Sequence, residues 1–484
     1  MKVVFVSSEI APFASTGGLG EVASSLPKAL ARQGVDVVSV MPFYRQVADG
    51  GYGAVDTSLR LAVPLGFVVR RAEVWKTEGA GPRVYFIRRD EYFDRRGLYG
   101  LPERDYDDNF ERFAFFQKAV VGLIDLLRLD PDIVHLHDWT GGLVPLFLRH
   151  GLHGTGRTAR ERTVFTIHNL AYQGLFPAAD FGLTNLPFSC FSVPVMEFYG
   201  RINCMKAGIA SSDLVTTVSG RYAGDIRTPE YGCGLDGVLQ SLGDRLKGIQ
   251  NGVDEDVWNP AADRFLETDY DANRPAGKAA NKRQLLGQLG WDGASAMRRP
   301  LVGMVARLVD QKGLNILAEA MPEMMKRDIG FVLLGSGDSA HEAMAQEWAR
   351  SWPDRFHTRI GYDQVLAHRI QAASDLFLMP SRHEPCGLSQ LYAMRYGTLP
   401  VVHATGGLDD TVRDLDESPA DGNGIKFREY TAAAMLAAVD RALAVLSDSS
   451  RRGAVIRRIM SEDHSWARSA REYADLYARL SRPA

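Results

Sequence analysis

Basic and acidic side chains in the second half of the chain stand where a polar ligand could be bound. Arg307 and Lys312 lie in the run ARLVDQKGL, directly after an apolar segment that predicts a strand, and Glu384 follows a later segment of the same kind. In open α/β sheets, ligands bind at the carboxyl ends of the strands. Two cations there suit a diphosphate, since no acidic residue is nearer in sequence than Asp310. A solvated surface pair is the alternative.

A Thr-Gly-Gly-Leu turn occurs once in each half of the chain, at Thr16–Leu19 and at Thr405–Leu408. Each turn follows a strand-like segment and precedes a helix-like one. Glycines let backbone N–H groups approach a ligand closely, and a helix N-terminus favours phosphate or polarised hydroxyls. A plain strand-to-helix turn is the alternative for either copy. Two copies favour one ligand shared by the two halves.

Polar residues also end two strand-like segments of the first half. They are His135, His137, Asp138 and His168. A zinc site is one hypothesis, but HExxH and paired-cysteine spacings are missing, so the sequence predicts no metal site. Side chains alternate along a strand, so His135 and His137 should share a face. We interpret this edge as a sugar-binding rim with Trp139 and Tyr172 as stacking surfaces.

The elements that position these residues follow a βαβ pattern of short β-branched runs, glycine-rich turns and helix-period stretches. The strands predicted in the first half are Val3–Val6, Val35–Met41, Ile133–His137, Val164–His168, Leu214–Val218 and Leu246–Gln250. Those in the second half are Leu301–Ala306, Phe331–Leu334, Asp375–Met379 and Leu399–His403. The predicted fold class is α/β, with two Rossmann-like, doubly wound parallel-sheet domains.

Two domains also follow from the length of 484 residues, because single cores stop growing at roughly 250 to 300 residues. The pattern breaks after Asn251, so we predict domains at residues 1–250 and 251–464. Residues 465–484 predict a terminal helix with one apolar face. That face holds Trp466, Ala470, Tyr473, Tyr477 and Leu480. Its periodicity does not say which domain it covers.

The overall charge narrows the classes of partner. Lys plus Arg number 56 against 59 for Asp plus Glu, so no strong field favours nucleic acid or an anionic membrane. The four cysteines form no CxxC pair, which favours a reducing compartment. The apolar run at the start is too short for a signal peptide or a membrane span. The sequence therefore predicts a cytoplasmic protein that binds neither nucleic acid nor membrane.

Seven blocks in register resemble the bacterial glycogen synthases and plant starch synthases over essentially the whole chain. The blocks are SSEIAPFASTGGLGEV, HLHDW, TIHNLAYQG, NGVDEDVWNP, ARLVDQKGL, SRHEPCGLSQLYAMRYGTLPVV and ATGGLDDTV. The resemblance implies a GT-B fold, in which two domains face each other across a deep cleft, and a terminal helix that returns to the first domain. It implies retaining transfer of glucose from ADP-glucose or UDP-glucose to the non-reducing end of an α-1,4-glucan, such as glycogen or a maltooligosaccharide, without metal or cofactor.

The residue roles come from the resemblance as well. It implies that the donor diphosphate is bound by Arg307, Lys312, Gly17 and Gly18, and the transferred glucose by Glu384 in a pocket lined by Cys386, Gly387 and Leu388. It places His168 beside the anomeric carbon, Asp138 at glucose hydroxyls or the acceptor, and Tyr362 on the nucleobase. Further predicted substrate-binding residues are Ser15, Tyr99, Asn169, Asn251, Thr405, Gly406 and Gly407. The implied mechanism is front-face transfer, with cations stabilising the leaving diphosphate and no protein nucleophile.

The sequence departs from the family pattern at the first glycine turn. Most members have lysine where this chain has Ser15, and Glu21 stands where aspartate is usual. A hydroxyl cannot replace a positive charge beside a diphosphate. Two alternatives therefore stay open: a GT-B transferase with UDP-glucose or another acceptor, and an inactive glucan-binding relative.

Overall fold

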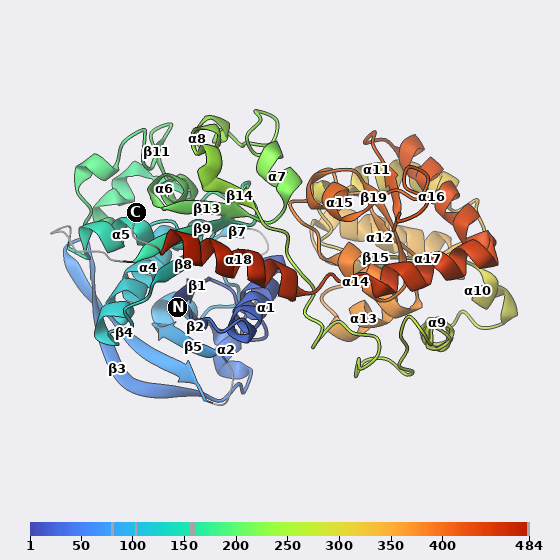
Figure 1. The fold of residues 1–484 in the computed structure, drawn as a ribbon, viewed down its shortest axis with the longest axis horizontal. Helices are drawn as coiled ribbons and strands as arrows, with labels where there is room; N and C mark the ends of the chain where they lie inside the picture. Colours follow the sequence, from blue (N-terminus) through green and yellow to red (C-terminus); the bar gives the residue numbers. More distant parts are fainter. Residues whose placement is uncertain (79–81, 102–103, 154–160, 482–484) are drawn as a thin grey trace. The chain divides into compact units, whose positions relative to one another are not determined.

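The computed structural model describes residues 1–78, 82–101, 104–153 and 161–481 (Figure 1). The chain divides into two compact units, of which the first comprises Met1–Asn251 with Trp466–Ala484 and the second comprises Gly252–Ser465. Each unit has its own sheet with helices packed on it, and the α/β fold class is confirmed. The first unit is assembled from two separate stretches of sequence.

The first unit is built on a nine-stranded sheet. In sheet order the strands are β14 (Leu246–Gly248), β13 (Leu214–Thr217), β9 (Arg162–Ile167), β8 (Ile133–His137), β1 (Lys2–Val6), β2 (Asp36–Pro42), β5 (Arg83–Arg88), β4 (Val68–Thr77) and β3 (Ala54–Leu65). From β14 to β5 every pairing is parallel. The central strands are buried on both faces, as their mostly apolar sequences predict.

The sheet is not entirely parallel, which corrects the sequence-based prediction. Strands β3 and β4 form a hairpin that adds antiparallel to β5 at one edge. The sequence analysis missed all three strands. The residues of β3 alternate between exposed and partly buried over much of its length, and β4 carries several charged residues. Such two-faced strands lack the continuous apolar run by which the buried parallel strands were recognised.

Helices cover this sheet, and a small three-stranded sheet lies beside it. The helices are α1 (Gly18–Arg32), α2 (Arg45–Asp49), α3 (Asp90–Phe93), α4 (Asn109–Leu126), α5 (Val144–His150), α6 (Cys204–Ser211), α7 (Gly220–Asp225), α8 (Asp236–Ser241) and α18 (Trp466–Leu480). The small sheet contains β10 (Leu175–Pro177), β12 (Arg201–Asn203) and β11 (Glu197–Phe198). A two-stranded ribbon, β6 (Gly100–Leu101) with β7 (Arg104–Asp105), completes the strands.

Helix α18 packs on the first unit, as the family resemblance implies, and lies beside α1 (Figure 1). The apolar face expected from the sequence is buried at Trp466, Ala470, Tyr473 and Tyr477, whereas Leu480 is only half-buried. The Tyr477 hydroxyl lies 2.6 Å from Nδ1 of the buried His135 on β8. The last turn of the chain is thereby attached to the centre of the first sheet.

The second unit has a six-stranded sheet in which every pairing is parallel. In sheet order the strands are β17 (Phe356–Ile360), β16 (Gly330–Gly335), β15 (Leu301–Val305), β18 (Leu376–Met379), β19 (Leu399–His403) and β20 (Ile425–Phe427). Its helices are α9 (Gly277–Gln288), α10 (Ala294–Arg298), α11 (Leu314–Met324), α12 (Ser339–Ser351), α13 (Gln364–Ala373), α14 (Ser389–Arg395), α15 (Gly406–Thr411), α16 (Ala432–Ser447) and α17 (Ser449–Ser461).

The segment that opens the second unit is held by an aromatic stack. The Trp258 ring lies between His368 of α13, at a centroid distance of 3.8 Å, and Tyr392 of α14, at 4.0 Å. Asp263 accepts hydrogen bonds from the buried His368 ring and from the Tyr396 hydroxyl. An irregular segment is thus fixed by aromatic packing and a buried carboxylate, two features that hydrophobic periodicity does not reveal.

Within the part of the chain that the structure describes, no helix is both long and apolar enough to cross a bilayer.

Candidate active site

Lys312 and Glu384 form an ion pair in the second unit. Lys312 ends the short 3-10 helix η5 (Asp310–Lys312) after β15, and Glu384 follows β18. Lys312 Nζ donates to Glu384 Oε2 at 2.5 Å, and the Ser381 hydroxyl donates to the same oxygen at 2.9 Å. The two charged side chains retain only 17% and 10% of their exposure. Lys312 therefore has a carboxylate partner that is distant in sequence.

The neighbouring positions of β15 and β18 explain this pairing. The two strands are adjacent and parallel, so the loops after them meet at one edge although Lys312 and Glu384 are 72 positions apart. Sequence spacing had made Asp310 the nearest acid, but Asp310 instead bonds to His341. An incoming diphosphate would have to share Lys312 with Glu384.

The glycines of the second turn lie directly against the backbone of another loop. Gly406 has a φ of +44°, and a Cβ added there would lie 2.2 Å from the carbonyl oxygen of Glu384. A Cβ on Gly407 would lie 2.2 Å from the carbonyl oxygen of Cys386, and the Gly407 N–H donates to the Glu384 carbonyl at 3.0 Å. The turn at the start of α15 thus fixes the backbone that carries the Glu384 carboxylate.

The structure brings most of the predicted second-unit residues into this loop cluster. Cys386 and Thr405 are buried, Leu388 packs against the core, and Gly387 has a φ of +70° in the same loop. Cys386 is 5% exposed. Arg307 and Tyr362 follow β15 and β17 at the same edge of the sheet, but both are exposed, Tyr362 by 90%.

The first glycine turn is held by a residue that the sequence analysis did not single out, Glu9. The Glu9 carboxylate accepts the Thr16 N–H at 2.5 Å, the Thr16 hydroxyl at 2.9 Å and the Tyr99 hydroxyl at 2.7 Å. Burial raises the pKa of Glu9, and these hydrogen bonds oppose the rise. A buried carboxylate just beyond a central strand was the available signal, but nothing in the sequence pairs it with Thr16.

Hydroxyl groups extend this network toward the end of β8. The Tyr99 hydroxyl lies 2.8 Å from the Ser8 hydroxyl, and the Thr140 hydroxyl donates to Ser8 at 3.0 Å. Tyr99 was predicted from the family resemblance alone. The structure places it between the first glycine turn and the strand end that carries Asp138.

Gly17 of the first turn, unlike the glycines of the second turn, borders open space. Gly17 has extended backbone at φ 179°, and a Cβ added there would have no neighbour within 4 Å. Gly17 caps α1 without a side-chain hydrogen bond, and Ser15, Gly17 and Gly18 are all exposed. The Ser15 hydroxyl donates to the Gly17 carbonyl at 3.1 Å. A side chain at Gly17 would thus extend into open space.

Asp138, His137 and His168 meet where β8 and β9 end. Asp138 adopts a φ of +52°, and its carboxylate accepts the His168 backbone N–H at 2.8 Å. Burial raises the pKa of Asp138 to about 7, although backbone hydrogen bonds oppose the shift. His137 Nδ1 lies 2.8 Å from His168 Nε2, and burial lowers the pKa of His168 to about 3. The histidines are therefore neutral near pH 7.

His135 and Trp139 have structural contacts. The rings of His135 and His137 lie 4.3 Å apart, so the expectation that they share a face is confirmed. His135 bonds to Tyr477 of α18. The Trp139 ring packs on Phe113, and a Cβ on Gly174 would lie 2.6 Å from it. Trp139 is only partly buried, so these contacts hold its ring in place, and its role as a stacking surface stays a prediction.

Three further predicted residues of the first unit lie beyond the ends of strands. Asn251 is 7% exposed and ends the first of the unit's two stretches of sequence, beyond β14. Asn169 follows His168, and its side chain accepts the Ala171 N–H at 3.1 Å. Tyr172, in the same loop, is 51% exposed. In this loop Tyr172 is the aromatic side chain open to a ligand.

Among the described residues, no group of three or more histidine, cysteine, aspartate or glutamate side chains is placed to hold a metal ion. The adjacent acids Asp107 and Asp108 do not act as a pair. Asp108 forms a two-pronged ion pair with Arg95, at 2.6 and 2.7 Å, and precedes α4. The Asp107 side chain is 90% exposed. Acidic side chains are favoured at the start of a helix, which accounts for this position.

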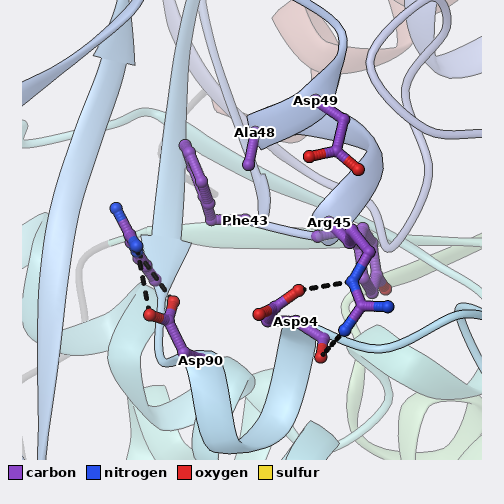
Figure 2. Close-up of a pocket in the computed structure, with 8 residues that line it drawn as sticks. Phe43, Arg45, Ala48, Asp49, Asp90 and Asp94 are labelled. Atoms are coloured by element: carbon purple, nitrogen blue, oxygen red, sulfur yellow. Dashed lines mark hydrogen bonds and ion pairs between the residues drawn. The ribbon is translucent and has the colours of Figure 1, made fainter.

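A cavity of about 380 Å³ lies at the ends of β2 and β5, apart from the predicted site residues (Figure 2). Figure 2 shows the Arg45 guanidinium bonded to Asp94, at 2.6 Å to the carboxylate and 3.0 Å to the carbonyl. Arg88 binds Asp90 with two hydrogen bonds. Both arginines that line this cavity are paired with carboxylates that also line it, so we assign the cavity no role in binding the donor.

Comparison with known proteins gives the family. The profile described as "Starch synthase catalytic domain" matches residues 2–241, and "Glycosyl transferases group 1" matches residues 291–454. Glycogen synthase 2 of Geobacter sulfurreducens is 45% identical, over 99% of this chain and 98% of that protein. The glycogen synthase of Anaeromyxobacter dehalogenans is 47% identical, over 99% of this chain and 100% of that one. The chain belongs to the glycogen synthase family. It is a glycosyltransferase, and the resemblance seen in the sequence is confirmed.

Solved structures agree with this assignment. The catalytic domain of starch synthase IV from Arabidopsis thaliana, bound to ADP and acarbose, superposes on the enzyme with a TM-score of 0.92 at 35% identity, covering 99% of each chain. Sucrose-phosphate synthase from Thermosynechococcus elongatus shares the fold, with a TM-score of 0.61 at 19% identity. The GT-B fold is thereby confirmed for this member of the family.

Proposed function

We propose that this enzyme transfers glucose from ADP-glucose to the non-reducing end of an α-1,4-glucan with retention of configuration. The observation that carries the proposal is the Lys312–Glu384 pair, assembled from two loops within a fold that matches glycogen synthases over the whole chain. Its ligands in this proposal are the nucleotide sugar and the glucan, and it binds neither nucleic acid nor membrane. No metal or other cofactor has a part in the reaction.

Stabilisation of the leaving diphosphate drives the proposed reaction. Arg307 and Lys312 are the cations that would bind it, and a positioned positive charge stabilises developing negative charge strongly where water is excluded. Glu384, held by Lys312 and Ser381, would bind the transferred glucose through its hydroxyls. The exposed ring of Tyr362 offers a face on which a nucleobase can stack. No nucleophilic side chain of the protein enters the reaction.

The first unit supplies the polar groups for the sugar in this proposal. Asp138 accepts hydrogen bonds from sugar hydroxyls when it is ionised, and His168, which is neutral, lies beside the anomeric carbon. Because His168 is neutral, it adds no positive charge that would oppose an oxocarbenium-like transition state. The acceptor hydroxyl attacks from the face that the diphosphate leaves, and a phosphate oxygen takes its proton.

Replacement of Lys312 tests the assignment. Lys312→Ala removes a diphosphate contact and leaves Glu384 without its partner, so we expect the release of ADP from ADP-glucose and glycogen to fall by about 100-fold or more. Lys326→Ala is the matched control, because Lys326 forms an exposed pair with Glu323 at 2.6 Å in the same unit. The control should retain the parent rate.

Two outcomes would contradict the proposal. Parent-level turnover in Lys312→Ala would remove this residue from the site. Equal or faster turnover of UDP-glucose in a donor panel would replace ADP-glucose as the donor. The linkage of the added glucose, read by ¹H NMR of the elongated chain, should be α-1,4.

We also propose a cytoplasmic location, which fits the lack of disulfide bonds among its four cysteines, all within the described ranges.

A further inference from the structure

Three histidines of the first unit lie in a row, which we call the histidine column, along β8 and at the end of β9. His135 and His137 lie on one face of β8, and His168 follows the adjacent strand β9. The ring centroids of His135 and His137 are 4.3 Å apart, and those of His137 and His168 are 5.1 Å apart. His135 uses both ring nitrogens, one with the Thr166 hydroxyl and one with the Tyr477 hydroxyl, each at 2.6 Å. His137 and His168 are left as a pair.

The two ring nitrogens of His137 have different surroundings. Nδ1 lies 2.8 Å from Nε2 of His168. Nε2 is buried and, in the described part of the chain, has no hydrogen-bond partner. The Phe5 ring packs against the His137 ring at a centroid distance of 4.1 Å. At 2.8 Å the two nitrogens form a hydrogen bond, so one of them carries the proton and the other accepts the hydrogen bond.

Burial keeps both rings neutral, because it lowers the pKa of His137 and of His168 well below the ordinary value. Two proton arrangements are then possible. If His168 donated from Nε2, the Nδ1 of His137 would be the acceptor, and His137 would carry its own proton on Nε2. That N–H would be a buried donor without an acceptor. If His137 donates from Nδ1, its Nε2 carries no proton and is only an acceptor without a donor. Buried donors without partners are rarer than unsatisfied acceptors, so the second arrangement is favoured.

We propose that His137 is a positioning residue that fixes the tautomer of His168. By donating from Nδ1 to Nε2 of His168, His137 requires His168 to carry its proton on Nδ1. No described residue forms a hydrogen bond with that nitrogen, and the His168 side chain is only partly buried. His168 thus presents an N–H donor to the ligand, which suits a sugar oxygen and excludes proton abstraction at that atom.

This inference rests on the proposed function, since that function places His168 at the sugar, but its test does not depend on turnover. Two-bond ¹H–¹⁵N NMR of the full chain labelled with ¹⁵N-histidine reads each tautomer directly. We expect His168 to be protonated on Nδ1 in the parent. The same result is expected in Tyr477→Phe, a control that removes a neighbouring hydrogen bond of the column. Protonation of His168 on Nε2 in the parent would overturn the inference.

Two variants of His137 separate positioning from packing. His137→Leu removes the donor, so the His168 proton should redistribute toward Nε2. His137→Asn carries an amide donor close to the position of Nδ1 and should restore the parent tautomer. In kinetics, we expect kcat to fall about tenfold in His137→Leu, as for other groups that orient a functional histidine, with KM for ADP-glucose nearly unchanged and with most of kcat recovered in His137→Asn.

The outcomes distinguish this inference from the function on which it rests. A His137→Leu protein with the parent tautomer of His168 would overturn the inference and leave the proposed function standing. If His137→Leu does not fold, the parent, Tyr477→Phe and His137→Asn still decide, because all three must show the Nδ1 proton. A chain with the expected tautomers that transfers no glucose would overturn the proposed function and leave the tautomer assignment standing.

Discussion

At the scale of single residues, Asp138 combines a rare backbone conformation with a buried charge. Its φ of +52° is one that asparagine adopts more readily than most residues. Its pKa near 7 means that the folded protein holds a proton on Asp138 between about pH 4 and 7, where the unfolded chain has already lost it. Stability from this group is therefore lost as the pH rises toward 7, and it stays lost above 7.

Asp138→Asn should therefore stabilise the protein and impair catalysis together. At pH 8 the substitution removes a buried charge without changing shape, and we expect a gain on the order of 2 kcal/mol. At pH 5 the gain should be much smaller. Thermal unfolding at the two pH values measures it. In the parent, kcat/KM should fall as the pH drops through 7. A gain in stability of Asp138→Asn over the parent that is no larger at pH 8 than at pH 5 would contradict this account.

Ser15 is one of two positions at which we expect this chain to depart from the family pattern. Its side chain is exposed and donates to the Gly17 carbonyl, so a longer side chain can be accommodated. Ser15→Lys restores a charge near the proposed diphosphate. An exposed charge pair contributes up to about 1 kcal/mol, so we expect KM for ADP-glucose to fall about threefold to fivefold.

Ser15→Gln provides length without charge and serves as the control for Ser15→Lys. It should leave KM near the parent value. Loss of activity in Ser15→Lys, with Ser15→Gln unaffected, would show that the first turn of this enzyme binds its ligand differently from the family pattern.

At the scale of elements, the two glycine turns are alike in sequence and opposite in packing. Gly406→Ala forces a Cβ to within 2.2 Å of the Glu384 carbonyl at a positive φ. We therefore expect lower stability and an activity loss of about 100-fold, since displacing a positioning group by about 1 Å can cost that much. Gly17→Ala meets no neighbour within 4 Å, so its thermal unfolding midpoint should match the parent.

Because Gly17→Ala should fold normally, its KM for ADP-glucose reports whether a ligand approaches the first turn. If a ligand approaches the N–H groups of the first turn, the added methyl group should raise KM for ADP-glucose although the fold is intact. A Gly17→Ala protein with parent stability and parent KM would show that the donor does not approach this turn closely. A tolerated Gly406→Ala would refute the packing argument for the second turn.

At the scale of the whole molecule, the first unit is complete only with helix α18, which is distant in sequence from the rest of the unit. Helix α18 buries Tyr473 and Tyr477 on this unit and bonds to His135 of the central strand β8. A chain that ends at Ser465 lacks these contacts and leaves His135 without one of its partners. We expect amide hydrogen exchange in β8 and α1 to accelerate in this truncated chain, while the core of the second unit exchanges as before.

Arg471→Ala, on the exposed side of α18, is the control for the truncation and should exchange like the parent. Equal acceleration in both units would mean that α18 stabilises the molecule as a whole. No acceleration in β8 would mean that the helix is an appendage that contributes nothing to the first unit.

Much of this protein can be predicted from sequence, because the relevant signals are local. Strands β1, β15 and β18 contain continuous apolar runs that are largely buried, and the face of α18 has helical spacing. The family motifs identify the reaction and the loops that carry it. The β3–β4 hairpin escaped prediction because alternating, charged strands resemble exposed loops when they are read one residue at a time.

Only the tertiary structure decided which groups meet. Glu384 neutralises Lys312, Glu9 holds Thr16, and His137 bonds to His168, each across a span of sequence that carries no pairing signal. Parallel strand pairing brings together the loops of the Lys312–Glu384 and His137–His168 contacts, and burial then sets the protonation of Asp138 and His168. Spacing along a chain specifies elements, whereas pKa values and hydrogen-bond partners depend on neighbours in space. The residue types and the reaction class were therefore readable from the sequence, and the partner of each charge was not.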